Sequence, residues 1–400
     1  MNNNVIFAAA GNGKTYGICQ RAREYLLDAH DNKYVLLLTY TNEGARSLEN
    51  EYQKQNYGVI DCNIKIKTWY GFLLSELIKP YQRNLKLKTK SYSKEYDFFL
   101  PENYIKSIAF YDTTDKPKYY KASHIQYYIN NAGDIYKDEA SRLAYECIQQ
   151  SDGKVIKRLE NIYSCIFIDE LQDYAGWDLE LFKVLFDSSI NITCVGDYKQ
   201  ATFRTNNSTK NKKFRDDRIK DFFVSLYNEE KCTISFDNKT RRFGYDICSY
   251  ANTFFKDDKE SLIIPNKTIL DDKEGNAGVF LIDNKYLEQY CAYYEPIILR
   301  YNKDSEISFN HNCRVYNYGA SKGATFDRTV IIPTKNVIQY IKTGKELAPQ
   351  TKAKLYVACT RAKYSIAFAV DNPTDTNLFI PGEIIVGENK IPVYKYSPTN

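Results

Sequence analysis

Short apolar runs alternate with helical patterns in the first part of the chain. Residues 5–7 form an apolar run, and a helical pattern follows over residues 14–29. Residues 34–42 have the pattern of a buried strand that ends in a polar turn, and residues 62–74 repeat this plan. Successive strand–turn–helix units predict a parallel, doubly wound sheet. The polar turns would then lie together at the carboxyl edge of that sheet.

The rest of the chain predicts an insertion and a second domain. Residues 76–154 are polar and rich in Tyr and Lys, which favours a mainly helical insertion, and the sheet resumes near residue 163. We therefore expect an α/β protein with two domains built on parallel sheets. The expected division is 1–75 with 155–225 for the first domain, 76–154 for the insertion, and 226–400 for the second domain. Strands of the second domain are predicted near residues 279–282, 297–300, 329–332 and 366–370, with a hairpin over 383–396.

The first polar turn, residues 8–15, has the composition of a phosphate-binding loop. Gly11 and Gly13 permit backbone angles and close approaches that a Cβ would block. Backbone N–H groups of such a turn, together with a helix N-terminus, bind phosphate oxygens. Lys14 can neutralise the β and γ oxygens, and the Thr15 hydroxyl can ligate Mg²⁺. The alternative from this segment alone is a glycine turn that precedes a helix by chance.

Two later strands end in polar groups suited to hydrolysis. The apolar residues 166–168 lead directly to Asp169 and Glu170. Asp169 is placed to hold Mg²⁺, and Glu170 is placed to take a proton from an attacking water. The next strand leads to Gln200, whose amide can hydrogen-bond a γ-phosphate or its water. The alternative for the acidic pair is a strand that merely ends at the surface.

Composition and charge set broader limits. The chain is 43% hydrophobic and 26% charged, which is typical of a globular protein, and it has no apolar stretch long enough to span a bilayer. The net charge of +5 is weak evidence for nucleic acid, but residues 199–220 hold eight Lys or Arg against two Asp. The ten cysteines are scattered, so a zinc site is not expected. The phosphate loop stands where a leader peptide would be, so we expect a cytoplasmic protein.

The motifs in this order resemble the UvrD/Rep/PcrA family of superfamily 1 helicases. The resemblance covers about residues 5–370. Beyond the phosphate loop, it rests on the strings Asp169-Glu170-Leu171-Gln172-Asp173, Gly196-Asp197-Tyr198-Lys199-Gln200, Thr39-Tyr40-Thr41-Asn42, Thr68-Trp69-Tyr70-Gly71, Ser321-Lys322-Gly323 and Tyr356-Val357-Ala358-Cys359-Thr360-Arg361. The family resemblance implies two RecA-like P-loop domains, with ATP and Mg²⁺ held in the cleft between them.

The resemblance also implies roles for individual residues. Glu170 and Gln200 act in hydrolysis, and Arg242 and Arg361 stabilise charge on the transferred phosphoryl group. Thr15 and Asp169 hold the metal. The implied nucleotide-binding residues are Ala10, Gly11, Asn12, Gly13, Lys14, Thr15, Tyr16, Arg241 and Gly323, with the adenine stacked between Tyr16 and Arg241. The family's glutamine motif does not precede the loop, so its contact to the adenine edge is not expected here.

Single-stranded DNA is the partner that the resemblance implies, with movement from 3′ to 5′. Aromatic side chains can stack on bases of any sequence, and basic residues add phosphate contacts. The implied DNA-binding residues are Thr39, Tyr40, Asn42, Thr68, Trp69, Tyr70 and Phe203.

Three functions follow as hypotheses. The first is an ATP-dependent DNA helicase or translocase, in which ATP hydrolysis is coupled to domain closure. The second is a DNA-stimulated ATPase subunit of a larger assembly, such as an antiphage defence complex of the Gabija type with a nuclease partner; a replication or repair protein is another possible partner. The third is a DNA-binding scaffold without activity, which the intact catalytic residues disfavour. Only 62 residues separate Asn252 from Val315, so the family's large second-domain insertion is expected to be absent or vestigial.

Overall fold

The computed structural model describes residues 3–28, 32–91, 94–110, 120–202, 208–265 and 276–398. The chain divides into two compact units. The first consists of Met1–Ile6, Lys14–Gly196 and Arg204–Ser235. The second consists of Phe7–Gly13, Asp197–Phe203 and Phe236–Asn400, so the phosphate loop up to Gly13 and the Gln200 segment group with the C-terminal half, whereas Lys14 and Thr15 belong to the first unit.

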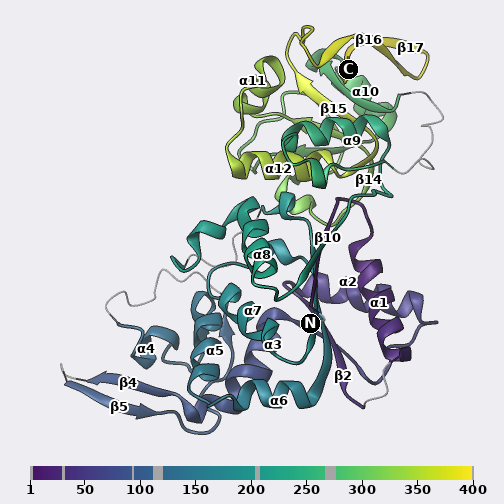
Figure 1. Ribbon diagram of the computed structural model, residues 1–400. Helices are drawn as coiled ribbons and strands as arrows, with labels where there is room; N and C mark the ends of the chain where they lie inside the picture. The colour runs from purple at the N-terminus through teal and green to yellow at the C-terminus, as the bar shows by residue number, and fades with distance from the viewer. Residues whose placement is uncertain are drawn as a thin grey trace. The chain divides into compact units, whose positions relative to one another are not determined.

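A six-stranded sheet forms the core of the first unit, in the order β10-β1-β9-β8-β2-β3. The pairs β2·β3, β2·β8 and β8·β9 are parallel. Helices α1 and α2 cover one face, and α7 and α8 lie on the other (Figure 1). The strands are β1 (Asn4–Ala8), β2 (Tyr34–Thr39), β3 (Ile64–Thr68), β8 (Tyr163–Ile168), β9 (Asn191–Gly196) and β10 (Thr233–Asp237). The helices are α1 (Lys14–Asp28), α2 (Asn42–Gln55), α3 (Trp69–Phe72), α6 (Lys154–Ile162), α7 (Asp178–Phe186) and α8 (Ile219–Asn228).

The expected insertion is less helical than its composition predicts. It contains an antiparallel hairpin, β4 (Lys86–Ser91) with β5 (Lys94–Phe99), which projects from the unit in Figure 1. Two further short strands, β6 (Ile108–Ala109) and β7 (Ile135–Tyr136), pair in parallel. Its α-helices are α4 (Ile125–Tyr128) and α5 (Ala140–Gln149), and a π-helix, Leu73–Ile78, connects α3 to this region.

The second unit has a seven-stranded sheet in the order β13-β12-β14-β15-β11-β17-β16. The first five strands are parallel, and the terminal β16–β17 hairpin adds antiparallel strands to one edge. The strands are β11 (Gly278–Asp283), β12 (Ile297–Arg300), β13 (Val315–Asn317), β14 (Phe326–Ile332), β15 (Ala362–Val370), β16 (Phe379–Val386) and β17 (Asn389–Tyr396). The helices are α9 (Tyr245–Asn252), α10 (Leu287–Tyr294), α11 (Lys335–Thr343) and α12 (Pro349–Cys359).

Alternation along these strands builds two separate cores. In β11, Leu281 packs in a cluster with α9, α11 and α12, whereas Phe280 and Ile282 pack in a cluster with α10. In β15, Phe368 packs in the cluster with α9, α11 and α12, and Ala367 packs in the cluster with α10. Successive side chains of a strand point to opposite faces, so helices cover both faces of the sheet.

The predicted fold class is confirmed, because both units are α/β with largely parallel sheets. The four strands predicted for the second unit and its terminal hairpin are also present. One boundary differs. Strand β10 joins the first sheet, although we placed residues 226–400 in the second domain.

Candidate functional site

The phosphate loop has the backbone that its glycines predict. Gly11 and Gly13 have φ angles of +74° and +93°, a region that favours glycine. Lys14 and Thr15 then begin α1, a helix of 15 residues. The loop therefore ends at a helix N-terminus, where unsatisfied N–H groups and the helix dipole favour an anion.

The loop is joined to the arginine-bearing segment that follows β10. The Arg241 N–H donates to the Gly11 carbonyl oxygen at 2.8 Å, and Asn12 Nδ2 donates to the Lys239 carbonyl oxygen at 3.1 Å. A Cβ added to Gly11 would lie 2.5 Å from Arg242 Cβ, so only glycine permits this approach. The structure thus brings the predicted loop and the predicted Arg242 together within the second unit.

Arg242 and Arg361 meet at the end of α12. Arg242 Nη1 donates to the Thr360 carbonyl oxygen at 2.7 Å, and burial lowers the pKa of Arg242 to about 10. Arg361 is buried and donates from Nε to the Val357 carbonyl oxygen at 3.0 Å. Arg242 therefore remains charged at neutral pH, and both guanidinium groups are held by backbone carbonyl oxygens.

Gln200 is the third member of this cluster. Its Nε2 donates to Asp197 Oδ2 at 2.8 Å, and its Oε1 accepts from Arg361 Nη2 at 3.2 Å. The Tyr356 hydroxyl donates to the same Asp197 oxygen at 3.2 Å. Burial and the nearby Asp197 raise the pKa of Tyr356. Two segments of the second unit, residues 197–200 and 356–361, thereby hold Gln200 and Arg361 together.

The acidic pair lies at the end of β8 in the first unit. Asp169 is buried, and its Oδ1 accepts from the Glu170 N–H at 2.8 Å. Glu170 adopts a left-handed conformation with φ +56° and ψ +47°, and its carboxylate accepts from Gln172 Nε2. For a residue with a Cβ this conformation costs about 1–2 kcal/mol. The turn after β8 therefore holds Glu170 in a strained backbone conformation.

The donor groups suit Mg²⁺ with a nucleotide. Mg²⁺ is typically held by one or two carboxylates together with substrate phosphates. Asp169 and the Thr15 hydroxyl are oxygen donors of the kind that Mg²⁺ takes, and Gly11 and Gly13 give the loop two left-handed turns without a Cβ. The residues present therefore fit both groups.

Tyr40 is the more accessible of the aromatic residues predicted to bind DNA. Tyr40 follows β2 and is half-buried, whereas Tyr70 lies in α3 and is buried, so its ring is not free to stack on a base as predicted. Their hydroxyls are hydrogen-bonded at 2.5 Å, and their rings make an edge contact at 5.4 Å. Thr68 accepts from the Gly71 N–H at 3.2 Å and caps α3, so it fixes the turn that carries Tyr70.

Trp69 corrects one expectation. Its side chain is fully buried, and Nε1 donates to Asp178 Oδ1 at 2.7 Å. The ring packs against Tyr174, Phe72 and Phe182. A ring enclosed in this way cannot stack on a base, so Trp69 supports the DNA site from within the core.

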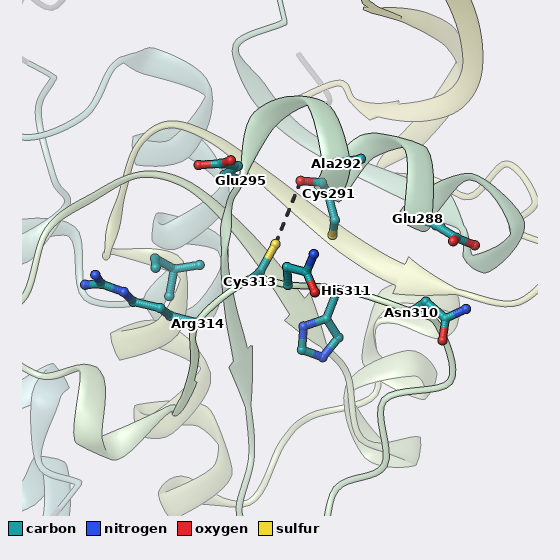
Figure 2. A pocket seen from close by; sticks show the side chains of 10 residues that line it. Glu288, Cys291, Ala292, Glu295, Asn310, His311, Cys313 and Arg314 are labelled. Atoms are coloured by element: carbon teal, nitrogen blue, oxygen red, sulfur yellow. Dashed lines mark hydrogen bonds between the residues drawn. The ribbon is translucent and has the colours of Figure 1, made fainter.

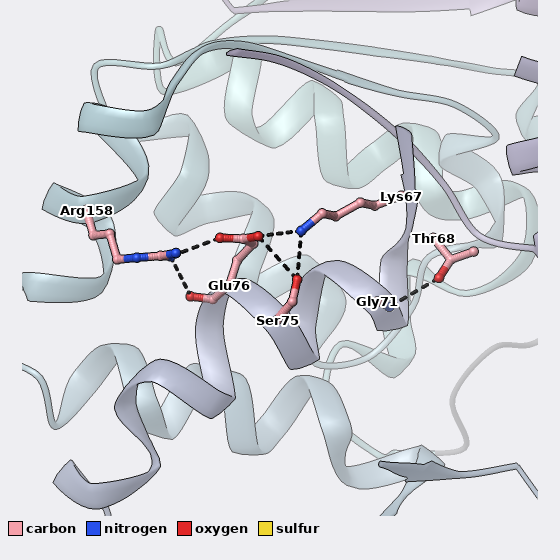
Figure 3. A network of polar contacts seen from close by, with 6 residues as sticks. All are labelled: Lys67, Thr68, Gly71, Ser75, Glu76 and Arg158. Carbon is pink, nitrogen blue, oxygen red and sulfur yellow. Dashed lines mark hydrogen bonds and ion pairs between the residues drawn. The ribbon is translucent and has the colours of Figure 1, made fainter. Parts of the chain in front are cut away.

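An ion-pair network holds the segment that contains Thr68 (Figure 3). The Glu76 carboxylate lies between Lys67 of β3 and Arg158 of α6, with Arg158 Nη1 at 2.9 Å. Ser75 also accepts from Lys67 Nζ at 2.8 Å. These partners lower the pKa of Glu76 although burial opposes them. The network fixes β3 and the π-helix against α6.

The other predicted residues are placed as follows. Thr39 is buried at the end of β2, and Asn42 is exposed at the start of α2. Gly323 has a φ of +86° and open space around it. Tyr16 is 43% exposed in the first unit, and Arg241 is exposed in the second. Ala10 is buried in the core of the second unit, and Phe203 lies outside the described residues.

Two residues of this region were missed by sequence reasoning. Tyr174 follows the acidic motif, and its ring contacts both Tyr40 and Trp69. Asp178 begins α7 and accepts the bond from Trp69. The signal for Tyr174 was an aromatic residue directly after Asp173; Asp178 had no distinguishing signal.

A cavity of about 640 Å³ lies elsewhere in the second unit, and none of the predicted residues lines it. It is formed by α10 and the stretch before β13, with Glu288 and Arg314 at opposite ends of the lining (Figure 2). Cys313 Sγ donates to the Cys291 carbonyl oxygen at 3.9 Å. Burial raises the pKa of both thiols, so they stay protonated and unreactive near neutral pH.

Comparison with known proteins identifies the family. The sequence model of the UvrD/REP helicase N-terminal domain matches residues 1–132 and 73–218, which together cover more than half of the chain. The chain belongs to the UvrD/REP helicase family. This membership agrees with the order of motifs from the phosphate loop to Gln200.

Two similar proteins were found for this UvrD/REP family member. The Gabija protein GajB of Bacillus cereus (strain VD045) is 24% identical over 355 residues, which are 86% of this chain and 66% of GajB. The DNA complex of the arterivirus nonstructural protein 10 helicase matches with a TM-score of 0.44 and 11% identity, over 93% of this chain and 61% of that one. The chain thus spans about two thirds of the length of these proteins. Within its described part, no helix is both long and apolar enough to cross a bilayer.

Proposed function

We propose that this chain is an ATP hydrolase that is stimulated by single-stranded DNA and moves along the strand from 3′ to 5′ as a helicase or translocase. One observation carries the proposal. The phosphate loop lies against Arg242, which donates a hydrogen bond to the Thr360 carbonyl oxygen. The next residue, Arg361, donates a hydrogen bond to Gln200. A glycine loop and two arginines are the groups that phosphoryl transfer requires.

Each residue has a defined task in hydrolysis. The loop N–H groups and Lys14 bind phosphate oxygens, and Thr15 with Asp169 hold Mg²⁺, which neutralises phosphate charge when bound. Glu170 accepts the proton of the attacking water, and its left-handed backbone orients the carboxylate at the end of β8. Arg242 and Arg361 stabilise charge that develops on the phosphoryl group. Arginines in this role contribute about 10³–10⁵ in rate.

Coupling to movement is the finer part of the proposal. The acidic pair belongs to the first unit and the arginines to the second. Binding of a nucleotide by both sets of residues would close the units, and hydrolysis would release them. Tyr40 would contact the DNA strand during this cycle.

A second candidate is a DNA-stimulated ATPase subunit of a larger assembly. The similarity to a protein named Gabija protein GajB favours it over a replication or repair setting. A nuclease would then be the partner, in the cytoplasm of a bacterial or phage-infected cell. Both candidates use the same catalytic residues.

A strand-displacement assay separates the two candidates. The purified chain is given ATP, Mg²⁺ and a duplex with either a 3′ or a 5′ single-stranded tail. We expect unwinding of the 3′-tailed duplex only, and none by a Glu170→Gln variant. ATP hydrolysis without unwinding of either duplex would support the subunit role. Unwinding from the 5′ tail would contradict the proposed polarity.

A further inference from the structure

Tyr174 connects the DNA-binding aromatics to the acidic motif within the first unit. Its ring is fully buried and meets Tyr40 edge-on, with centroids 5.7 Å apart and planes at 85°. The opposite contact is with Trp69, at 5.0 Å and 84°. A base that stacks on Tyr40 therefore acts on a ring that is already packed against Tyr174.

Tyr174 is also tied to the hydrolytic carboxylates through the backbone. It directly follows the single 3₁₀ turn Leu171–Asp173, which begins after Glu170 in its left-handed conformation. The Asp173 N–H donates to the Glu170 carbonyl oxygen at 2.9 Å. Because this turn is short and hydrogen-bonded, Tyr174 and Glu170 cannot move far independently. A displacement of Tyr174 therefore changes the orientation of Glu170.

Asp178 fastens the same loop from its other end. Its Oδ2 accepts from the Ala175 N–H at 3.2 Å, and its Oδ1 accepts from Trp69 Nε1 at 2.7 Å and from the Ser141 hydroxyl. The loop after the acidic motif and the segment after β3 thus share one buried carboxylate. A shift of the loop after the acidic motif is therefore coupled, through Asp178, to a shift of the segment after β3.

We propose that Tyr174 is a positioning residue that transmits strand binding at Tyr40 to the Asp169–Glu170 pair and so produces stimulation of ATP hydrolysis by DNA. The inference rests on the proposed function and adds to it the route of coupling. The ring carries the effect. The Tyr174 hydroxyl is buried and has no hydrogen-bond partner among the described residues, so the ring alone makes the connecting contacts.

The test compares Tyr174→Leu, Tyr174→Phe and a matched control. Tyr128→Leu is the control, because Tyr128 is also a fully buried tyrosine of the first unit whose hydroxyl has no described partner. The readout is the ratio of ATP turnover with saturating oligo-dT to turnover without it. A purely structural loss lowers both rates and leaves this ratio unchanged.

We expect Tyr174→Leu to lower the ratio by about 2- to 30-fold, the range of measured coupling effects. Tyr174→Phe should keep the wild-type ratio, and so should Tyr128→Leu. A wild-type ratio in Tyr174→Leu, or an equal fall in Tyr128→Leu, would overturn the inference while the proposed function stands. A wild-type chain that hydrolyses ATP without any response to oligo-dT would overturn the proposed function, and the inference with it.

Discussion

The buried Arg361 guanidinium donates a hydrogen bond from Nη2 to Gln200 Oε1 at 3.2 Å, across 161 positions of the sequence. Asp197 holds the Gln200 amide in this orientation by accepting from Nε2. The bond joins the Gly-Asp-x-x-Gln motif to the last motif of the chain. Gln200, which is expected to contact the terminal phosphate, is therefore hydrogen-bonded to Arg361, which is expected to stabilise charge on that phosphate.

Replacing Gln200 with alanine should uncouple this pair. Gln200→Ala removes the acceptor for Arg361, so ATP turnover should fall by about 100-fold or more, as when one positioned group is lost from a charge-stabilising site. Gln82→Ala is the matched control, because Gln82 is also buried and uses both ends of its amide in hydrogen bonds. Steady-state hydrolysis measures the effect. Equal losses in the two variants would count against a specific role for Gln200.

The two aromatics Tyr40 and Trp69 should respond differently to substitution. Tyr40→Ala should weaken binding of single-stranded DNA by about 1–3 kcal/mol, the contribution of one stacked base. Trp69→Ala should instead lower the free energy of unfolding by about 3–5 kcal/mol, because it empties a buried site. Fluorescence anisotropy with oligo-dT and chemical denaturation measure the two quantities. A Trp69→Ala variant that is as stable as wild type but no longer binds DNA would contradict the buried placement and indicate that Trp69 contacts DNA directly.

Gly11 should tolerate no side chain. Gly11→Ala adds a Cβ at 2.5 Å from Arg242 Cβ in a backbone with φ +74°, so nucleotide binding should be lost. Gly153→Ala is the control, because Gly153 has φ +75° with no atom within 4 Å of the added Cβ. That variant should lose only about 1 kcal/mol of stability from backbone strain. Titration with a fluorescent ATP analogue distinguishes them, and equal affinities in both variants would disprove the steric role.

Asp178 should make stability depend on pH. Burial raises its pKa from 3.8 to about 6, so the folded chain keeps this proton at pH values where the unfolded chain has released it. Its contribution to the free energy of unfolding should therefore fall as the pH rises from about 4 to about 6, by up to roughly 3 kcal/mol. Chemical denaturation of wild type and Asp178→Asn across this pH range measures the contribution of Asp178, as the difference between their free energies of unfolding. A difference between the two proteins that stays constant with pH would contradict it.

The sequence predicted the parallel strands well, because their apolar runs are uninterrupted and several end in recognisable motifs. The prediction was wrong for the β4–β5 hairpin, where the strand pattern was present but was not recognised. Lys86, Lys88 and Lys90 alternate with Leu87 and Thr89, a period-two pattern typical of a strand, but the polar composition of the region favoured helices.

The sequence motifs propose residues for the site but do not reveal the environments of those residues. Trp69 and Tyr70 are neighbours in one short helix and both are buried, yet only Tyr70 reaches Tyr40, because helical neighbours face different directions. The sequence gives no sign that both pack inward. The bond between Trp69 and Asp178 depends on residues 109 positions apart, which no local pattern reveals.

The rate of ATP hydrolysis by the purified chain, with and without oligo-dT, tests the central claim most directly. We expect a Mg²⁺-dependent rate that rises when oligo-dT is added, and no hydrolysis by Lys14→Ala or Glu170→Gln, both of which should still bind oligo-dT. Hydrolysis that persists in both variants, or a wild-type rate that DNA leaves unchanged, would contradict the account.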